Sequence, residues 1–251
     1  MATGGARMQT VLAIPAFNEE GALPPLLERA ARIPGIDRVL VVDDGSTDNT
    51  ASIVERWQGP PPATVVRHER NQGLGAAMRT ALANVAAAPL ADDDVVVTMD
   101  ADNTHDPALI PRLCAQVAAG NDVVVASRYC PGGREFGLSL HRRLLSRGVS
   151  TLLSVLRPVP GVRDYSCGFR AYRVGALRKA LERYGADGLV VTEGFACMAE
   201  ILLRLDRSGS RCSEVPLELH YERKSGPSKM RVARTVGGYL QLLRAIPGRR
   251  G

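Results

Sequence analysis

The sequence predicts an α/β fold in which helices cover both faces of a mostly parallel sheet. Short runs of β-branched residues recur along the first half of the chain, and amphipathic stretches with a helical period separate them. The runs are apolar throughout, as is typical of parallel strands buried on both faces. The chain has 251 residues, 45% of them hydrophobic and 23% charged, which is enough to bury such a sheet and excludes a disordered chain.

Strands and helices are expected to alternate in the first half. The β-branched runs predict strands at 10–14, 38–42, 64–67, 94–98 and 122–126. The amphipathic stretches predict helices near 20–33, 48–58, 74–87 and 107–119. Ligands of parallel sheets bind beyond the carboxyl ends of the strands, so the residues that follow each strand are the candidate site.

Beyond residue 127 the pattern changes. A Gly/Pro-rich loop at 129–137 precedes a long helix predicted over 138–157, with an apolar stripe formed by Leu145, Val149, Leu152 and Leu156. Three more helices are predicted, at 174–184, 195–207 and 229–245. Short strands are expected near 168–172 and 211–219. We find no internal repeat and no linker, so the second half is expected to elaborate the same domain.

The charge of the chain is divided between its halves. Residues 1–126 contain nine basic and 16 acidic residues, whereas residues 127–251 contain 23 basic and ten acidic ones. The basic half indicates an anionic partner, such as a phosphate or a membrane surface, although a solvated basic surface has the same composition.

Three further features of the composition predict a cytoplasmic protein without transmembrane helices. No run of about 18 apolar residues is present. The first ten residues lack the apolar core of a secretory signal. The five cysteines are never spaced as CxxC, which indicates reduced thiols.

Acidic residues follow three of the predicted strands. The first strand leads into PAFNEE, the second into DDGSTDNT and the fourth into MDADNTHDP. Asp100 and Asp102 stand two residues apart on an extended segment, so their carboxylates point to the same side, about 6–7 Å apart. A D-x-D alone is a weak signal, but its alignment with two other acidic strand ends strengthens it. Such a pair suits Mg²⁺, which takes one or two carboxylates plus substrate phosphates.

As a set, these motifs resemble those of family 2 glycosyltransferases with the GT-A fold, a Rossmann-like architecture. The later segments SRYCPGG, HRRLLSRG, DYSCGFRAYR and EVPLELHYERKSGPSKM are similar to dolichol-phosphate mannose synthases, and the likeness extends over about residues 10–230. It implies a catalytic domain at 1–230, with a nucleotide-sugar half at 10–126 and an acceptor half at 127–230. An amphipathic helix and tail would follow at 231–251.

The resemblance also implies a role for each matching residue. The nucleotide-sugar would contact Pro15, Phe17, Glu19, Asp43, Asp44 and Ala101. A Mg²⁺ or Mn²⁺ cofactor and the diphosphate would be held by Asp100 and Asp102, with Thr104 as a further ligand of short reach. The acceptor phosphate would contact Arg128, Arg142, Ser146 and Asp164. Arg223 and Lys229 would fold over the diphosphate and complete the catalytic set.

The implied reaction is inverting transfer of a hexose, mannose from GDP-mannose, to a polyprenyl or dolichyl phosphate. The enzyme would be peripheral at the cytoplasmic face of a membrane, in direct contact or through an anchoring partner, and no nucleic-acid partner is expected. A phosphate acceptor is ionised near pH 7 and needs no general base. A hydroxyl acceptor would need a carboxylate such as Asp164 or Glu193. The open alternative is a UDP-sugar-dependent glucosyl- or N-acetylglucosaminyltransferase acting on a polyprenyl phosphate or a soluble hydroxyl acceptor.

Two motifs have a second interpretation. The segment NQGLG imitates part of a dinucleotide fingerprint, but its third glycine is missing and it lies on the third βα turn, which favours close helix packing over an oxidoreductase. His105 is either a metal ligand or a helix-start residue.

Overall fold

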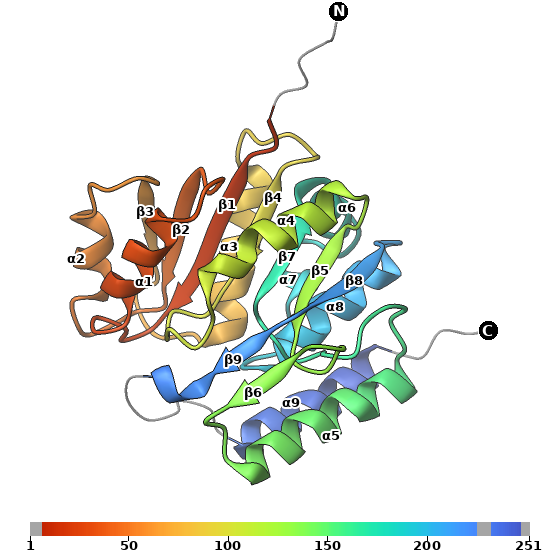
Figure 1. Ribbon diagram of the computed structural model, residues 1–251. Coiled ribbons are helices and arrows are strands. Elements are labelled where there is room, and N and C mark those ends of the chain that lie inside the picture. Colours follow the sequence, from red (N-terminus) through yellow and green to blue (C-terminus); the bar gives the residue numbers. More distant parts are fainter. Residues whose placement is uncertain (1–6, 225–231, 247–251) are drawn as a thin grey trace, which may run out of the picture.

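The computed structural model describes residues 7–224 and 232–246, apart from the side chains of residues 141–142 and 232–234. Seven strands form one sheet in the order β3-β2-β1-β4-β7-β5-β8 (Figure 1). They are β1 Thr10–Ala16, β2 Arg38–Asp43, β3 Ala63–Arg67, β4 Val95–Thr98, β5 Val123–Ser127, β7 Arg170–Arg173 and β8 Cys212–Pro216. All pairings are parallel except those of β7, which runs antiparallel to β4 and β5. The predicted mostly parallel sheet is confirmed.

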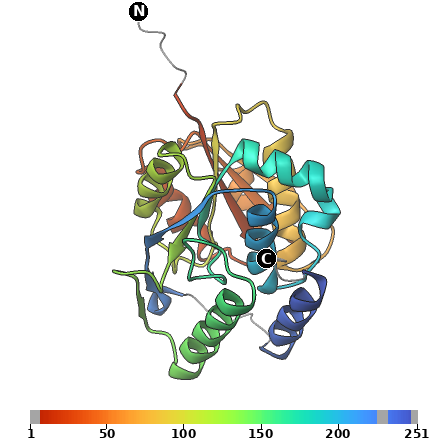
Figure 2. The same ribbon diagram turned by 90° about the vertical axis from the view of Figure 1, so that its right-hand side faces the viewer.

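Helices cover both faces of this sheet, as predicted. In Figure 1, α1 (Leu23–Ala31) and α4 (Ile110–Ala118, after the 3₁₀ turn η1 Pro107–Leu109) lie in front of the sheet. Helices α3 (Leu74–Ala87), α6 (Val174–Tyr184) and α8 (Ala196–Arg207) lie behind it, and Figure 2 shows the two layers edge-on. The short helix α2 (Thr50–Glu55) packs on β3, and α7 (Ala186–Leu189) connects α6 to α8.

Burial explains why the inner strands are apolar throughout. Every residue of β1, β4 and β5 is buried, whereas β3, at the edge of the sheet, is only partly covered. All five cysteines are free, in agreement with the prediction of reduced thiols. Because β1, β2 and β4 run parallel, their carboxyl ends meet at one edge, and the three acidic motifs meet there too.

A two-stranded ribbon extends from this edge, and one of its strands, β6, lies within the segment 129–137 that was expected to be a loop. Strand β6 (Arg134–Phe136) pairs in parallel with β9 (Glu218–His220), which continues into the 3₁₀ turn η2 (Tyr221–Arg223). The turn before β6 requires glycine, because a Cβ on Gly133 would lie 2.5 Å from the carbonyl oxygen of Ser127. The sequence misses β6 because three residues between glycines carry no strand pattern.

Helices α5 (Leu140–Leu156) and α9 (Val232–Ala245) lie at the same end of the molecule as the ribbon (Figures 1 and 2). Arg157 joins their C-terminal ends, because its guanidinium donates hydrogen bonds to the carbonyl oxygens of Leu243 and Ile246 at 2.9 and 2.6 Å. Among the described residues, no helix is both long enough and apolar enough to cross a membrane.

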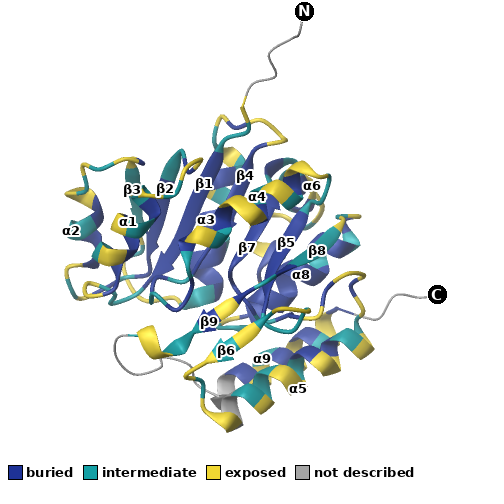
Figure 3. Ribbon diagram, in the orientation of Figure 1, coloured by how far each residue is buried: buried dark blue, intermediate teal, exposed yellow. Residues whose placement is uncertain are grey.

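The predicted apolar stripe of α5 is only partly correct, because Val149 packs against the core but Leu152 and Leu156 do not. Leu153 is the leucine that enters the core, at 1% exposure, and Val149 packs beside it. Leu152 and Leu156 of the predicted stripe are 49% and 43% exposed, and Figure 3 shows the exposed residues along the helix. Leucines lie on both sides of α5, so the sequence pattern alone does not identify the side that the core covers.

The burial of Leu153 and the exposure of Leu152 predict that substituting these neighbours by alanine destabilises the fold to different degrees. Leu153→Ala should lower the free energy of unfolding by about 2–5 kcal/mol, because it leaves a cavity in the core. Leu152→Ala, the matched control, should change it by no more than about 0.5 kcal/mol. Urea denaturation of both variants measures the difference, and equal losses would contradict the observed register.

Candidate active site

The loops after β1 and β2 bind each other at the carboxyl edge of the sheet. Asn18, with a left-handed φ of 51°, donates its backbone N–H to Ser46 Oγ at 2.9 Å and accepts the backbone N–H of Thr47 at 2.9 Å. The backbone N–H of Glu19 donates to Thr50 Oγ1 at 2.8 Å. These contacts bring the segment from Pro15 to Glu19 beside the end of β2, so the predicted nucleotide residues of both loops are neighbours.

Asp43 and Asp44 are both buried, and protein groups already engage them. Asp43 accepts the backbone N–H of Ser46 at 2.9 Å and lies 3.2 Å from Arg67 Nε. Asp44 contacts His68 Nδ1 at 2.7 Å and accepts the backbone N–H of Gly73 at 2.7 Å. Asp44 therefore connects the end of β2 to the glycine that precedes α3, next to the predicted nucleotide site.

Gly75, in the first turn of α3, allows a close contact between the helix and the loop after α7. A Cβ there would lie 2.3 Å from the carbonyl oxygen of Thr192. This contact agrees with the packing interpretation of NQGLG.

The loop after β4 presents Asp100 and Asp102. One oxygen of Asp102 accepts the hydroxyl of Thr104 at 2.7 Å, and the other forms an ion pair with Lys224. Asn103, between Asp102 and Thr104, has a left-handed φ of 63° and donates a hydrogen bond from its side-chain amide to the carbonyl oxygen of Ala22 at 2.7 Å. The turn is thus fixed to α1, and both carboxylates are held at the strand end.

The two carboxyl groups have opposite pKa shifts. Burial raises the pKa of Asp100 above its ordinary value, and the neighbouring Asp102 acts in the same direction, while His105 opposes them. Burial also acts to raise the pKa of Asp102, but the Lys224 ammonium and the hydrogen bonds from Lys224 and Thr104 outweigh it and lower that pKa. The site thus places two carboxyl groups close together, of which Asp102 is paired with a cation.

These residues fit a divalent cation that takes most of its ligands from elsewhere. Asp102 already holds a cation, the ammonium of Lys224. The described part of the chain contains no cluster of three or more His, Cys, Asp or Glu side chains arranged for a metal ion. Two carboxylates plus phosphate oxygens is the arrangement that Mg²⁺ favours.

The helix start considered for His105 belongs instead to its neighbour Asp106. Asp106 begins η1, accepting the backbone N–H of Ala108 at 3.0 Å. His105 is buried, with its ring 5.1 Å from that of Phe169.

The C-terminal basic residues reach the same loop through β9 and η2. Arg223 Nη1 lies 3.8 Å from Asp106 Oδ2, and Lys224 binds Asp102. Lys229 lies outside the described residues. Sequence reasoning missed Lys224, and its only signal was its position next to Arg223.

A second cluster follows β5, around Arg128. Its guanidinium binds Asp164 through Nε at 2.7 Å and Nη2 at 2.8 Å, and Nη2 also donates to Ser166 at 2.7 Å. The Asp164 side chain is fully buried and that of Arg128 is 9% exposed. Burial opposes both charges, but their ion pair outweighs it, lowering the pKa of Asp164 and raising that of Arg128. Asp164 therefore fixes the position of Arg128.

A pocket of about 310 Å³ opens beside this pair, between β6 and α5. Its lining comprises Arg128, Tyr129, Gly133, Arg134, Glu135, Phe136, Arg143 and Arg147. Tyr129 donates its hydroxyl to Ser146 at 2.9 Å, and Ser146 lies 3.1 Å from Ser166, so the predicted Ser146 joins the network around Arg128. Arg142 lies in α5, but its side chain is outside the described residues. Arg143 and Arg147, which follow Arg142 on the same helix, line the pocket.

The buried ion pair predicts that Asp164→Asn lowers the free energy of unfolding strongly near pH 7 and less at acidic pH. The change leaves Arg128 buried without its counter-ion, at a cost of about 3–5 kcal/mol in the free energy of unfolding near pH 7. Because folding lowers the pKa of Asp164, its stabilisation is present above the unfolded pKa of about 3.9 and is lost as the pH falls through the folded value. Urea denaturation should therefore show a gap between wild type and variant that narrows in acid.

Asp187→Asn is the control, because Asp187 is 95% exposed and pairs with Arg79 at the surface. Its cost should not exceed about 1 kcal/mol. Equal costs for the two variants would contradict the role given to Asp164.

Comparison with known proteins identifies the family. The family model "Glycosyl transferase family 2" matches residues 11–181. The chain is 34% identical over 91% of its length to a polyprenol monophosphomannose synthase of Mycolicibacterium smegmatis, covering 83% of that protein. It is 32% identical over 89% of its length to an undecaprenyl-phosphate mannosyltransferase of Micrococcus luteus, covering 88%. A dolichol-phosphate mannosyltransferase of Pyrococcus furiosus is 29% identical over 93% of this chain, which spans 62% of that protein.

Solved structures agree at the level of the fold. Glucosyl-3-phosphoglycerate synthase of Mycobacterium tuberculosis, in complex with Mn²⁺, UDP-glucose and phosphoglyceric acid, superposes with a TM-score of 0.69 at 21% identity, over 96% of this chain and 80% of that one. A complex of the same synthase with Mg²⁺ and UDP gives 0.67 at 22% identity, over 96% and 79%. The chain therefore belongs to glycosyltransferase family 2 and is a glycosyltransferase with the GT-A fold.

Proposed function

We propose that this enzyme transfers mannose from GDP-mannose to a polyprenyl phosphate, with inversion at the anomeric carbon. The observation that carries the proposal is the arginine-lined pocket beside Arg128, which offers a phosphate group several guanidinium donors at the carboxyl edge of the sheet. The names of the relatives from Mycolicibacterium, Micrococcus and Pyrococcus, which join mannose to a polyprenol, undecaprenyl or dolichol phosphate, support mannose as the sugar and a polyprenyl phosphate as the acceptor.

The proposed reaction is a single displacement. A phosphate oxygen of the acceptor attacks the anomeric carbon and forms the new C–O bond. The bond from that carbon to the diphosphate breaks, and GDP leaves with the electron pair. Asp100 and Asp102 would hold Mg²⁺ or Mn²⁺, which supplies positive charge to the leaving diphosphate. Arg223, at the end of the ribbon, would add its own charge on that side, with Lys229 as its proposed partner.

The carboxylates near the acceptor pocket support a phosphate acceptor. A hydroxyl acceptor needs a general base with a free oxygen within hydrogen-bond reach. Both oxygens of Asp164 are bound to Arg128, and Glu135 lies between two guanidinium groups. A phosphate acceptor loses no proton in the reaction, so this environment suits it.

A second donor has one observation in its favour. The structural neighbour from Mycobacterium tuberculosis binds UDP-glucose in the same fold. UDP-glucose is therefore the competing donor, and the donor experiment below separates the two.

We further propose that α5 and α9 contact the membrane that holds the lipid acceptor. Seven of the nine exposed large hydrophobic side chains in the described part of the chain lie on these helices, among them Leu140, Leu144 and Val155 of α5 and Leu240 of α9. Arg143, Arg147 and Arg244 adjoin them. Apolar residues flanked by arginines are typical of helices that lie in the interface of an anionic bilayer.

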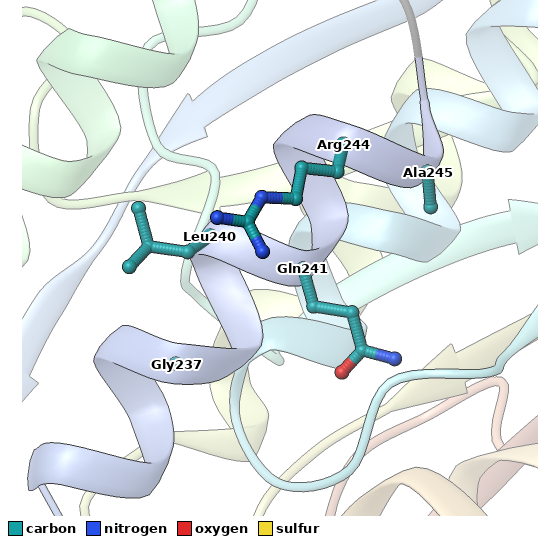
Figure 4. Close-up of a pocket in the computed structure, with 5 residues that line it drawn as sticks. All are labelled: Gly237, Leu240, Gln241, Arg244 and Ala245. Carbon is teal, nitrogen blue, oxygen red and sulfur yellow. The ribbon is translucent and has the colours of Figure 1, made fainter.

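The outer face of α9 supports this arrangement. A shallow groove of about 510 Å³ runs along it, lined by Gly237, Leu240, Gln241, Arg244 and Ala245 (Figure 4). Leu240 and Arg244 project from the helix in Figure 4, so an apolar and a basic side chain are presented together.

The donor and acceptor are tested together by product formation. Wild-type enzyme with Mn²⁺ should release GDP from GDP-mannose only when a short polyprenyl phosphate is present, and mass spectrometry should detect the mannosylated phosphate. Asp102→Asn should lower turnover at least about 100-fold through loss of charge at the leaving group. Asp92→Asn, on a surface turn, is the matched control and should retain activity. Transfer from UDP-glucose alone, or to a hydroxyl acceptor, would contradict the proposal.

Membrane contact is tested by sedimentation with anionic liposomes. Leu144 and Val155 are eleven residues apart on α5 and therefore lie on one side of the helix. Leu144→Glu with Val155→Glu should weaken binding at least about tenfold, since burying one such side chain is worth about 1.5–3 kcal/mol. Val191→Glu, at an exposed valine outside both helices, should not weaken it. Unchanged binding of the double variant would contradict this assignment.

A further inference from the structure

Glu135 stands inside the pocket that the proposed function assigns to the acceptor phosphate. Its side chain is only 7% exposed, although it belongs to a short strand at the surface. One carboxylate oxygen lies 3.3 Å from Arg128 Nη1, and the other lies 3.5 Å from Arg143 Nε. The carboxylate thus bridges two guanidinium groups, as two oxygens of a phosphate would.

The contacts of Glu135 are longer than those of the permanent partner of Arg128. Asp164 binds Arg128 at 2.7 and 2.8 Å, which is the normal range for a charge-assisted hydrogen bond. At 3.3 and 3.5 Å, Glu135 lies beyond that range. Arg143 Nε is buried and has no hydrogen-bond partner among the described residues. The pocket therefore contains a donor that Glu135 does not satisfy.

The charges in the pocket favour a further anion. Four of the residues that line it are arginines and one, Glu135, is acidic, with Asp164 behind Arg128. Arg147 lies over the ring of Tyr129, 5.7 Å from its centre, and forms no ion pair with any described residue. Burial raises the pKa of Glu135 above its ordinary value, although the nearby arginines oppose this shift. The carboxylate is therefore in a costly position.

Glu135 also belongs to an element with few attachments. Strand β6 has three residues, and within the described chain it pairs only with β9. A side chain on such a ribbon moves at a lower cost than one on a central strand of the main sheet.

We propose that Glu135 is an internal anion that occupies the acceptor-phosphate subsite and that the phosphate of the acceptor displaces it from Arg128 and Arg143. This inference rests on the proposed function, because it states what the acceptor replaces. The carboxylate keeps the two guanidinium groups positioned before the acceptor arrives. It also competes with every anion that enters, so inorganic phosphate, which has no lipid chain, binds weakly, while an acceptor whose lipid chain adds further contacts still binds.

Glu135→Gln tests the proposal, because it keeps the size of the side chain and removes its charge. A short polyprenyl phosphate and inorganic phosphate should each bind the variant about tenfold more tightly by calorimetry, corresponding to the loss of one competing charged hydrogen bond. In the transfer assay, KM for the acceptor should fall while kcat does not rise, and inorganic phosphate should inhibit at about tenfold lower concentration. If Glu135 served only to hold the arginines in place, Glu135→Gln would instead bind both phosphate ligands more weakly than wild type.

The controls separate this inference from the proposed function. Glu218→Gln removes an exposed charge from the partner strand, opposite Arg134, and should leave both affinities unchanged. Arg143→Gln should weaken both. Glu135→Ala, with its melting temperature compared with wild type, provides a second uncharged variant.

If both Glu135 variants bind inorganic phosphate no more tightly than wild type, the inference is overturned, even where wild type transfers mannose. If wild type transfers nothing to polyprenyl phosphate, the proposed function fails, and tighter phosphate binding by Glu135→Gln still supports the internal anion.

Discussion

The site depends on the balance of buried charge at the carboxyl edge of the sheet. Parallel strands that end together bring Asp43, Asp44, Asp100 and Asp102 to one edge, where burial makes each negative charge costly without a partner. The fold supplies partners for three of them from other segments: Arg67 for Asp43, His68 for Asp44, and Lys224 for Asp102. These pairs connect the loops at this edge to one another.

Two internal charged groups, Lys224 and Glu135, have the same sign of charge as the ligand proposed at the same place. Lys224 holds Asp102 where a divalent cation is proposed, and Glu135 bridges two arginines where a phosphate is proposed. Both belong to one structural unit: Glu135 lies on β6, and Lys224 follows the turn after β9, its partner strand. A ring contact between Phe136 and His220, with centroids 5.0 Å apart, joins the strands. On the proposals made above, the ribbon carries the groups that each ligand would replace.

The sequence predicted the parts of this arrangement that depend on local pattern. The β-branched runs identified the inner strands because those strands are buried on both faces, and strand ends identified Asp100 and Asp102. Contacts between distant segments were not predictable. Lys224 lies 122 positions from Asp102, and the pairing of Arg128 with Asp164 joins the end of one strand to a separate loop. The face of α5 was misjudged because its leucines occupy both sides, and only packing identifies Leu153 as the buried one.

Mn²⁺ binding to wild type and to Lys224→Met tests the central claim most directly, with free Mn²⁺ measured by electron paramagnetic resonance. If Lys224 occupies the position that the cation takes, removing its ammonium should tighten Mn²⁺ binding about tenfold, and Asp102→Asn should abolish it. Equal Mn²⁺ affinities for wild type and Lys224→Met, or undiminished binding by Asp102→Asn, would contradict the claim that ligands replace internal charges at this edge of the sheet.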